Sequence, residues 1–317
     1  MDPRGYQIAA LAALLAYGLF WLRFDIRPDI VVTLLAATLA AQWCCWRAVS
    51  SSRVDYKSAV ISALSLCLLL RTASPLVAAV AATLTIGSKF AVRVRGKHVF
   101  NPTNFGIVAT LLLTRDAWVS SGQWGDAALF AFFVASIGMI VVTRAARADV
   151  TFGFLCIYAG LLIGRSAWLG EPLAIPLHRL QSGALLIFAF FMISDPKTTP
   201  DSRSGRMLFA LLVGLGAYYV QFRLFRPNGL LWSLAVWSPV VPLLDRMLRA
   251  DRYGWNQAAL RCEGHGGNDV EQDTGDAGGI GGARDAAADA SGGLLWFLRR
   301  PRGREALQHG VAGRARP

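Results

Sequence analysis

The sequence predicts an all-α fold: a polytopic integral membrane protein with about ten transmembrane helices, some short or broken, and a disordered C-terminal tail. Hydrophobic residues make up 54% of the 317-residue chain and charged residues only 16%, whereas soluble domains have about 25% charged residues. The mean hydropathy is +0.43. The apolar residues form continuous runs, whereas a membrane β-barrel would show alternating strands of about ten residues.

Ten apolar segments account for the predicted helices. They are residues 7–22, 29–46, 58–70, 75–88, 105–114, 125–142, 152–163, 182–193, 207–222 and 229–244. A full span needs about 20 residues, so the third, fourth, fifth, seventh and eighth segments are short. We expect these to extend into their polar flanks or to form broken helices, whose backbone ends can bind ligands inside the membrane. The first segment is interpreted as a retained helix, because no convincing signal-peptide cleavage site follows it.

The chain is expected to divide into two parts. Residues 1–250 form the transmembrane helical domain, and residues 251–317 form a cytoplasmic tail. Within the tail, residues 263–293 are rich in Gly, Asp and Ala and show no apolar periodicity. Such a composition buries too little apolar surface to offset the conformational entropy of the chain, so the tail is expected to be disordered.

The distribution of positive charge predicts the orientation of the chain. Lys and Arg in the loops on the N-terminal side of the bundle outnumber those on the opposite side two to one. The positive-inside rule then predicts a multi-pass protein of the cytoplasmic (inner) membrane with both termini in the cytoplasm. The net charge of +12 is explained by this topology and by anionic lipid headgroups, so the lipid membrane, and not nucleic acid, is the expected partner.

The first polar island, residues 89–106, lies between two apolar segments. Its bases can serve as anchors to the cytoplasmic leaflet. Pro102 suits the first turn of a helix, which makes Asn101 a candidate N-cap. Asn101 and Asn104 share a helix face, and their amides offer the donors and acceptors that the edge of an isoalloxazine ring needs. Two roles stay open for the asparagines: helix capping together with packing, or ligand binding. The candidate cofactor-binding residues are Asn101, Asn104, Lys97, His98, Arg95 and Arg93.

The second polar island, residues 192–206, contains the prolines and capping residues of a helix stop, a turn and a new helix start. It leaves an acid, Asp195, at the end of an apolar helix, where the acid can form a structural pair or serve an ion or proton path. The candidate residues for either role are Asp195, Lys197, Thr198 and Thr199. At the end of the last segment, Asp245 is expected to form a surface pair with Arg246.

Motifs of metal sites and of soluble enzymes are missing from the sequence. The five cysteines form no CxxC pair and no Cys/His ligand spacing, so no metal site is predicted. There is no P-loop, Rossmann glycine fingerprint, HExxH or GxSxG motif. The catalytic residues, if any, are not identifiable from the sequence.

Several motifs in a fixed order resemble one known family. They are Arg-x-Arg-Gly-Lys-His-x-Phe-Asn-Pro at 93–102, Ser-Gly-Ala at 182–184, Phe-Phe-Met-Ile-Ser-Asp-Pro-Lys-Thr-Thr-Pro at 190–200, Gly-Arg at 205–206 and Val-Pro-Leu-Leu-Asp at 241–245. Over roughly residues 55–246 the chain resembles the NqrB/RnfD family, the membrane-embedded B subunits of Nqr and D subunits of Rnf, which are ion-translocating, flavin-dependent electron-transport complexes. The resemblance implies ten transmembrane helices, partner electron-transport subunits and a non-covalent flavin, riboflavin or FMN, near Asn101.

The chain also departs from the pattern of this family. Some members have an asparagine where this chain has His98. Members carry a Ser-Gly-Ala-Thr-type segment whose threonine holds FMN through a phosphoester bond, whereas the matching region, residues 118–125, has no threonine. Covalent FMN is therefore not expected. The chain is similar to a divergent branch that includes membrane proteins found with enediyne natural-product pathways.

The leading functional hypothesis is a membrane subunit of a flavin-dependent electron-transport system, coupled or not to cation translocation. Such a subunit need not be catalytic alone. The alternative from another class is a transporter or export accessory protein without a redox centre, which would use the same broken helices to bind its cargo. A third hypothesis is a structural subunit that only docks partners.

Overall fold

The computed structural model describes residues 3–20, 27–49, 54–120 and 147–251, together with the short pieces 138–139 and 142–143. The described residues are mostly helical, which confirms the predicted class in its coarse form. Most of the sixth apolar segment and the tail beyond Asp251 lie outside the described residues. The number of ten spans and the disorder of the tail therefore stay predictions.

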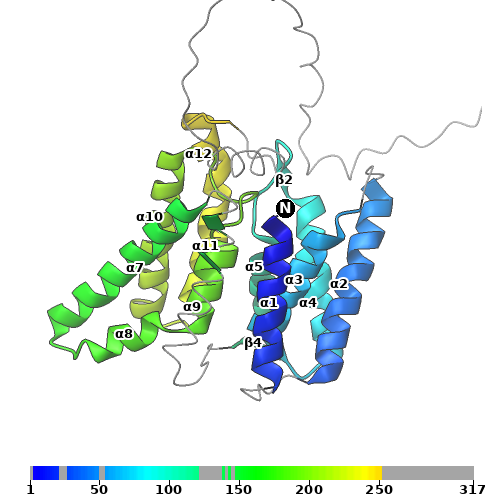
Figure 1. Ribbon diagram of the computed structural model, residues 1–317, viewed down its shortest axis with the longest axis horizontal. Coiled ribbons are helices and arrows are strands. Elements are labelled where there is room, and N and C mark those ends of the chain that lie inside the picture. The colour runs from blue at the N-terminus through cyan, green and yellow to red at the C-terminus, as the bar shows by residue number, and fades with distance from the viewer. Residues whose placement is uncertain are drawn as a thin grey trace, which may run out of the picture.

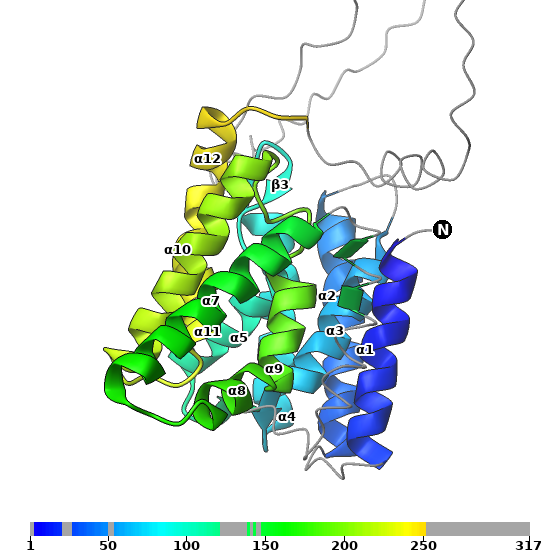
Figure 2. The same cartoon turned by 60° about the vertical axis from the view of Figure 1, so that its left-hand side comes forward.

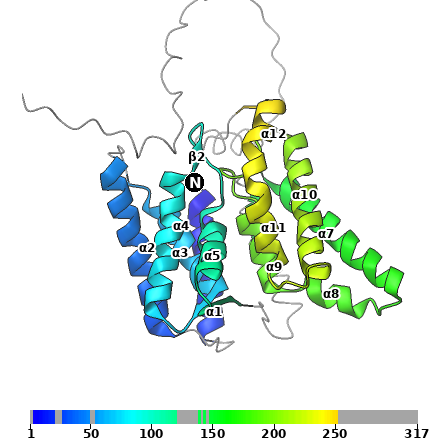
Figure 3. The same cartoon turned by 180° about the vertical axis from the view of Figure 1, so that it is seen from behind.

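The helices fall into two groups that lie side by side (Figures 1 and 3). The first group contains α1 (Pro3–Phe20), α2 (Pro28–Val49), α3 (Tyr56–Leu69), α4 (Pro75–Ala91) and α5 (Pro102–Leu113). The second group contains α7 (Ala148–Leu169), α8 (Ala174–Leu180), α9 (Gly183–Ile187), η1 (Phe188–Met192), α10 (Arg203–Phe222), α11 (Gly229–Trp237), η2 (Ser238–Val240) and α12 (Val241–Met247). Nine of the ten predicted apolar segments coincide with helices in the described part of the chain.

Three of the described helices, α2, α7 and α10, are long and apolar enough to cross a membrane. A fourth span can be formed by α8 together with the helix from α9 to η1, which are bent by 49° at their junction. α7 has 22 residues, so this segment extends well into its polar flanks, which was one of the two expectations for the short segments. α9 continues into η1, a π-helix; such helices are rare and frequently occur at functional sites.

α3 and α5 remain short, with 14 and 12 residues, and strands lie beyond their C-terminal ends. β1 (Leu70–Thr72) pairs antiparallel with β4 (Ala117–Val119). The buried guanidinium of Arg71 donates to the backbone carbonyls of Cys67 and Leu70 at 2.8 and 3.1 Å. Non-helical backbone in a membrane protein must find its partners inside the protein, and this strand pair provides them. The strands are an addition to the all-α prediction.

Capping residues fix where several helices begin. The Ser74 hydroxyl accepts a hydrogen bond from the Val77 N–H at the start of α4, where Pro75 occupies the first turn. The Ser202 hydroxyl accepts from the Gly205 N–H at 3.0 Å at the start of α10. These contacts satisfy backbone donors that have no partner within the helix.

Helices within each group pack closely. In the first group, α4 packs against α2 and α5, and in the second, α10 packs between α7 and α11 (Figure 2). A Cβ added at Gly106 on α5 would lie 1.8 Å from the Thr85 Oγ1 on α4. Glycine there allows the two helices to approach, as small residues do in many membrane bundles. Phe154, Phe188 and Phe209 are fully buried in the second group.

Both polar islands lie at the same end of the bundle, together with the N-terminus and α12 (Figure 1). We call this the basic end; β4 and α8 lie at the opposite end. At the basic end, β2 (Arg93–Val94) pairs with β3 (Lys97–His98) in a hairpin. Its two turn residues, Arg95 and Gly96, have φ angles of 51° and 76°, and positive φ at both central positions is the property of a type I′ turn.

Candidate functional site

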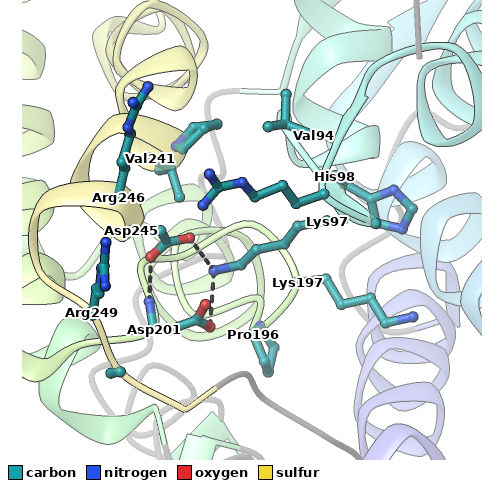
Figure 4. Close-up of a pocket in the computed structure, with 14 residues that line it drawn as sticks. Val94, Lys97, His98, Pro196, Lys197, Asp201, Val241, Asp245, Arg246 and Arg249 are labelled. Carbon is teal, nitrogen blue, oxygen red and sulfur yellow. Dashed lines mark hydrogen bonds and ion pairs between the residues drawn. The ribbon is translucent and has the colours of Figure 1, made fainter. Parts of the chain in front are cut away.

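The hairpin, the loop after η1 and α12 enclose a cavity of about 600 Å³ at the basic end (Figure 4). We call it the outer cavity. Its volume lies within the range of small-molecule and cofactor sites, about 300–1,000 Å³. Its charged and titratable lining residues are Arg95, Lys97, His98, Lys197, Asp201, Asp245, Arg246 and Arg249. The structure thus brings residues of both polar islands to one site.

Lys97 lines the outer cavity and forms ion pairs with two carboxylates. Its ammonium lies 3.0 Å from the Asp201 carboxylate and 2.8 Å from the Asp245 carboxylate (Figure 4). Asp245 also accepts a hydrogen bond from the backbone N–H of Asp201 at 2.8 Å. The three side chains are only 8–20% exposed, so their charges are poorly screened and hold the hairpin, the loop and α12 together. The expected surface pair of Asp245 with Arg246 is wrong, because Asp245 bonds Lys97.

His98 lies beside the outer cavity with an unsatisfied nitrogen. Its Nδ1 is buried and has no hydrogen-bond partner among the described residues. Burial, and after it the charges of Arg93, Lys197 and Lys89, lower the pKa of His98 to about 3. The ring is therefore neutral near pH 7 and can donate or accept one hydrogen bond at each nitrogen according to its tautomer.

The two remaining bases of the hairpin differ in position. Arg95 is exposed and lines the outer cavity. Arg93 is not among the cavity residues: its Nε donates to the Lys89 carbonyl, and its guanidinium lies 5.3 Å from the centre of the Phe90 ring. Burial lowers the pKa of Arg93 from its usual value. Arg93 therefore supports the base of the hairpin.

Asn101 caps α5 and ties it to the second helix group. The Asn101 side-chain oxygen accepts a hydrogen bond from the Asn104 N–H at 3.1 Å, which confirms the predicted N-cap. Its amide nitrogen donates to the Met192 carbonyl at the end of η1, at 3.3 Å. Asn101 is 5% exposed. Both polar atoms of this amide therefore have backbone partners.

Asn104 makes a second link between the groups. Its amide nitrogen donates to the Leu231 carbonyl on α11 at 3.1 Å. Its side-chain oxygen has no partner among the described residues, but the residue is fully buried and lines neither cavity. Ligand binding by Asn101 and Asn104 stays a prediction, whereas their capping and packing contacts are present.

Asp195 is held within its own turn. Its carboxylate accepts a hydrogen bond from the Lys197 N–H at 3.0 Å, and its backbone carbonyl accepts from the hydroxyls of Thr198 and Thr199 at 3.3 and 3.0 Å. Burial raises the pKa of the Asp195 carboxyl, and the Lys197 N–H and nearby cations oppose this rise. The predicted group Asp195–Thr199 is therefore a compact polar turn.

A second, smaller space of about 70 Å³ lies deeper in the bundle. We call it the inner cavity; it has room for about two water molecules. Its polar lining residues are Arg4, Gln7, Asp55, Ser58, Ser62, Ser65, His98, Asn101, Thr103, Ser194, Asp195 and Lys197. His98, Pro196 and Lys197 line both cavities, so these three residues separate the outer space from Asp195.

Three residues that line the outer cavity were not among the ligand candidates predicted from the sequence: Asp201, Arg246 and Arg249. Their contact with the hairpin depends on residues about 100 to 150 positions apart in the chain. The one signal in the sequence was the recurrence of polar segments on the same predicted side of the membrane. Among the described residues, no three His, Cys, Asp or Glu side chains are placed to hold a metal ion.

Comparison with known proteins gives a partial match. Residues 110–254 match the NQR2, RnfD, RnfE family. The D subunit of the ion-translocating oxidoreductase complex from Escherichia coli O1:K1 / APEC is 30% identical over 140 residues. The protein of the same name from Shigella boydii serotype 18 is 29% identical over 140 residues. In both cases the match covers 44% of this chain and 35% of the relative, so the chain matches about a third of the length of these proteins.

The matched range confirms the resemblance over the second helix group and the end of α5. Asp195, Lys197, Thr198 and Thr199 lie inside it, whereas the hairpin and the two asparagines lie before residue 110.

Proposed function

Because residues 110–254 match the NQR2, RnfD, RnfE family, we propose that this chain is the membrane subunit of a flavin-dependent electron-transport system. This family match is the observation that carries the proposal. The subunit crosses the inner membrane about ten times, has its basic end in the cytoplasm as the positive-inside rule requires, and works with partner electron-transport subunits.

The outer cavity is the place we propose for a non-covalently bound flavin. Its volume of about 600 Å³ leaves room for the isoalloxazine ring, and the neutral ring of His98 is part of its wall. Arg95, Lys97 and Lys197 would surround the rest of the cofactor. When bound, a flavin supplies the capacity to accept and release electrons singly or in pairs.

Asn101 and Asn104 contribute to this site indirectly. They hold α5 against η1 and α11, and η1 leads into the loop that lines the outer cavity. We propose that they join the two helix groups beside the cavity, in place of the predicted contact with the flavin. No threonine lies in residues 118–125, which supports non-covalent binding.

We propose that coupling to a cation uses the inner cavity. Two acids line this cavity together with serines of α3: Asp55, which pairs with Arg4 at 2.9 Å, and Asp195. A carboxyl whose pKa is raised by burial can take up a proton near neutral pH more readily than an exposed one. We propose Asp195 as the group that links charge movement to the redox state.

The proposal is tested by the colour and redox behaviour of the purified protein. The protein is expressed with ample riboflavin, purified in mild detergent, scanned in the visible range, and then precipitated with acid. We expect a yellow protein whose absorption bleaches with dithionite and whose flavin moves to the supernatant. Flavin that stays on the precipitate would contradict the non-covalent assignment. A colourless protein would contradict the proposal and favour the transporter or export accessory without a redox centre.

A further inference from the structure

The outer cavity holds more positive than negative charge. Arg95, Lys97, Lys197, Arg246 and Arg249 line it, against only Asp201 and Asp245. Lys97 pairs with both carboxylates. Among the residues that the structure describes, the four other cations have no carboxylate within ion-pair distance.

Membrane topology alone does not explain this arrangement. The positive-inside rule requires basic residues at this end of the bundle, but it does not require residues from three separate segments to line one concave space. Arg95 comes from the hairpin, Lys197 from the loop after η1, and Arg246 and Arg249 from α12 and the residues that follow it. Positive side chains that line one space repel one another, and a bound anion offsets this repulsion.

The surroundings of His98 are also positively charged. Neighbouring cations add to the effect of burial in lowering the pKa of His98, so a proton is disfavoured where an anion would be favoured. Asp201 and Asp245 share the Lys97 ammonium (Figure 4), so these three groups together carry one net negative charge against the four other cations of the cavity.

We propose that the outer cavity binds the phosphate group of an anionic ligand. Guanidinium groups bind phosphate through two parallel hydrogen bonds. Arg246 and Arg249 supply two such groups on the α12 side of the cavity, whereas the Lys197 side chain extends away from them (Figure 4). The inference deepens the proposed flavin site, on which it rests for the choice of FMN over riboflavin. A lipid phosphate from the surrounding leaflet would satisfy the same groups.

The experiment compares ligands with and without phosphate on the full-length protein in a neutral detergent. Flavin-free protein is titrated with FMN and with riboflavin, and separately with inorganic phosphate against chloride at equal ionic strength, with thermal shift as the readout. We expect FMN to bind at least ten-fold more tightly than riboflavin and inorganic phosphate to raise the Tm with saturation.

The matched variants test the location of the phosphate. The double variant Arg246→Gln, Arg249→Gln should reduce the FMN preference by at least ten-fold and abolish the phosphate shift. Arg203→Gln removes an exposed cation that is not among the cavity residues and should leave both unchanged. Equal losses in the two variants would mean a nonspecific charge effect and overturn the inference.

A lipid arm distinguishes the source of the phosphate. The protein is placed in nanodiscs of phosphatidylcholine alone or with phosphatidylglycerol. Suppression of FMN and phosphate binding by phosphatidylglycerol, lost in the double variant, would support the same site with a lipid headgroup as its occupant.

Equal affinity for FMN and riboflavin without any phosphate or phosphatidylglycerol effect would overturn the inference while leaving the flavin proposal intact. Saturable phosphate binding by a protein that binds no flavin would support the phosphate site and contradict the flavin proposal.

Discussion

The hairpin Arg93–His98 and the asparagine step Asn101–Asn104 are neighbours in sequence but use their polar groups differently. In the hairpin, Arg95, Lys97 and His98 line a cavity of about 600 Å³. In the asparagine step, three of the four side-chain amide atoms bond backbone groups, and the fourth is buried away from both cavities. The hairpin is therefore available to a ligand, whereas the asparagines join the two helix groups.

This difference shows where polarity in a membrane segment indicates binding. A buried polar group must find a partner, and that partner can be a ligand or a distant piece of backbone. The partners of the asparagines, Met192 and Leu231, lie 91 and 127 residues further along the chain. Only the folded structure tells which alternative applies.

The largest effect is expected where the hairpin meets the second helix group. Lys97→Met leaves the Asp201 and Asp245 carboxylates close together without their shared cation, which should lower the free energy of unfolding by about 3 kcal/mol. Adding Asp245→Asn should recover part of the loss, because the amide oxygen still accepts the Asp201 N–H. Denaturant unfolding in detergent measures the stability of both variants. A further loss of stability in the double variant would contradict the role of Lys97 as the shared partner of the two carboxylates.

The asparagine step should show a smaller structural effect. Asn101→Ala removes the cap of α5 and leaves the Met192 carbonyl without its partner, a loss of about 2 kcal/mol. Asn101→Ser keeps a capping hydroxyl and removes only the link to Met192, so it should lose about half as much. Unfolding midpoints rank the variants. Equal losses for Ala and Ser would show that the cap contributes nothing.

The protonation of His98 gives a pH test of the hairpin. The pKa of His98 is about 3 in the folded protein and about 6.5 in an unfolded chain. Between these values the unfolded state binds more protons, so stability falls as the pH drops below 6.5. At pH 5.5 this contribution is about 1.4 kcal/mol. His98→Asn should show a smaller decrease in Tm from pH 7 to pH 5.5 than the wild type; an identical decrease would mean that His98 is accessible to protons.

The smallest structural effect is expected at Asp195. Asp195→Asn retains an oxygen for the Lys197 N–H, and removing the charge ends both its burial penalty and its attraction to nearby cations. Stability should change by less than about 1 kcal/mol. Charge movement linked to reduction, measured in proteoliposomes, should nevertheless be lost if Asp195 carries the coupling. Unchanged coupling would leave Asp195 with only its role in the turn.

The sequence predicted the apolar segments and the N-cap at Asn101 well, because both depend on local patterns. It also placed both polar islands on one side of the bundle, through the count of basic residues in loops. It did not predict that α3 and α5 lead to a pair of strands, since the partners Leu70 and Val119 lie far apart in the chain. The pairing of Lys97 with Asp245, 148 residues away, was missed for the same reason.

The most direct test of this account compares flavin content in two variants of the purified, folded protein. Lys197→Gln with His98→Ala changes the outer cavity, and Asn101→Ser changes only a link between the helix groups. We expect the cavity variant to lose its flavin, whereas Asn101→Ser should keep the wild-type ratio of flavin to protein despite a lower Tm. Flavin retained by the cavity variant and lost from Asn101→Ser would contradict it and place the cofactor at the asparagines.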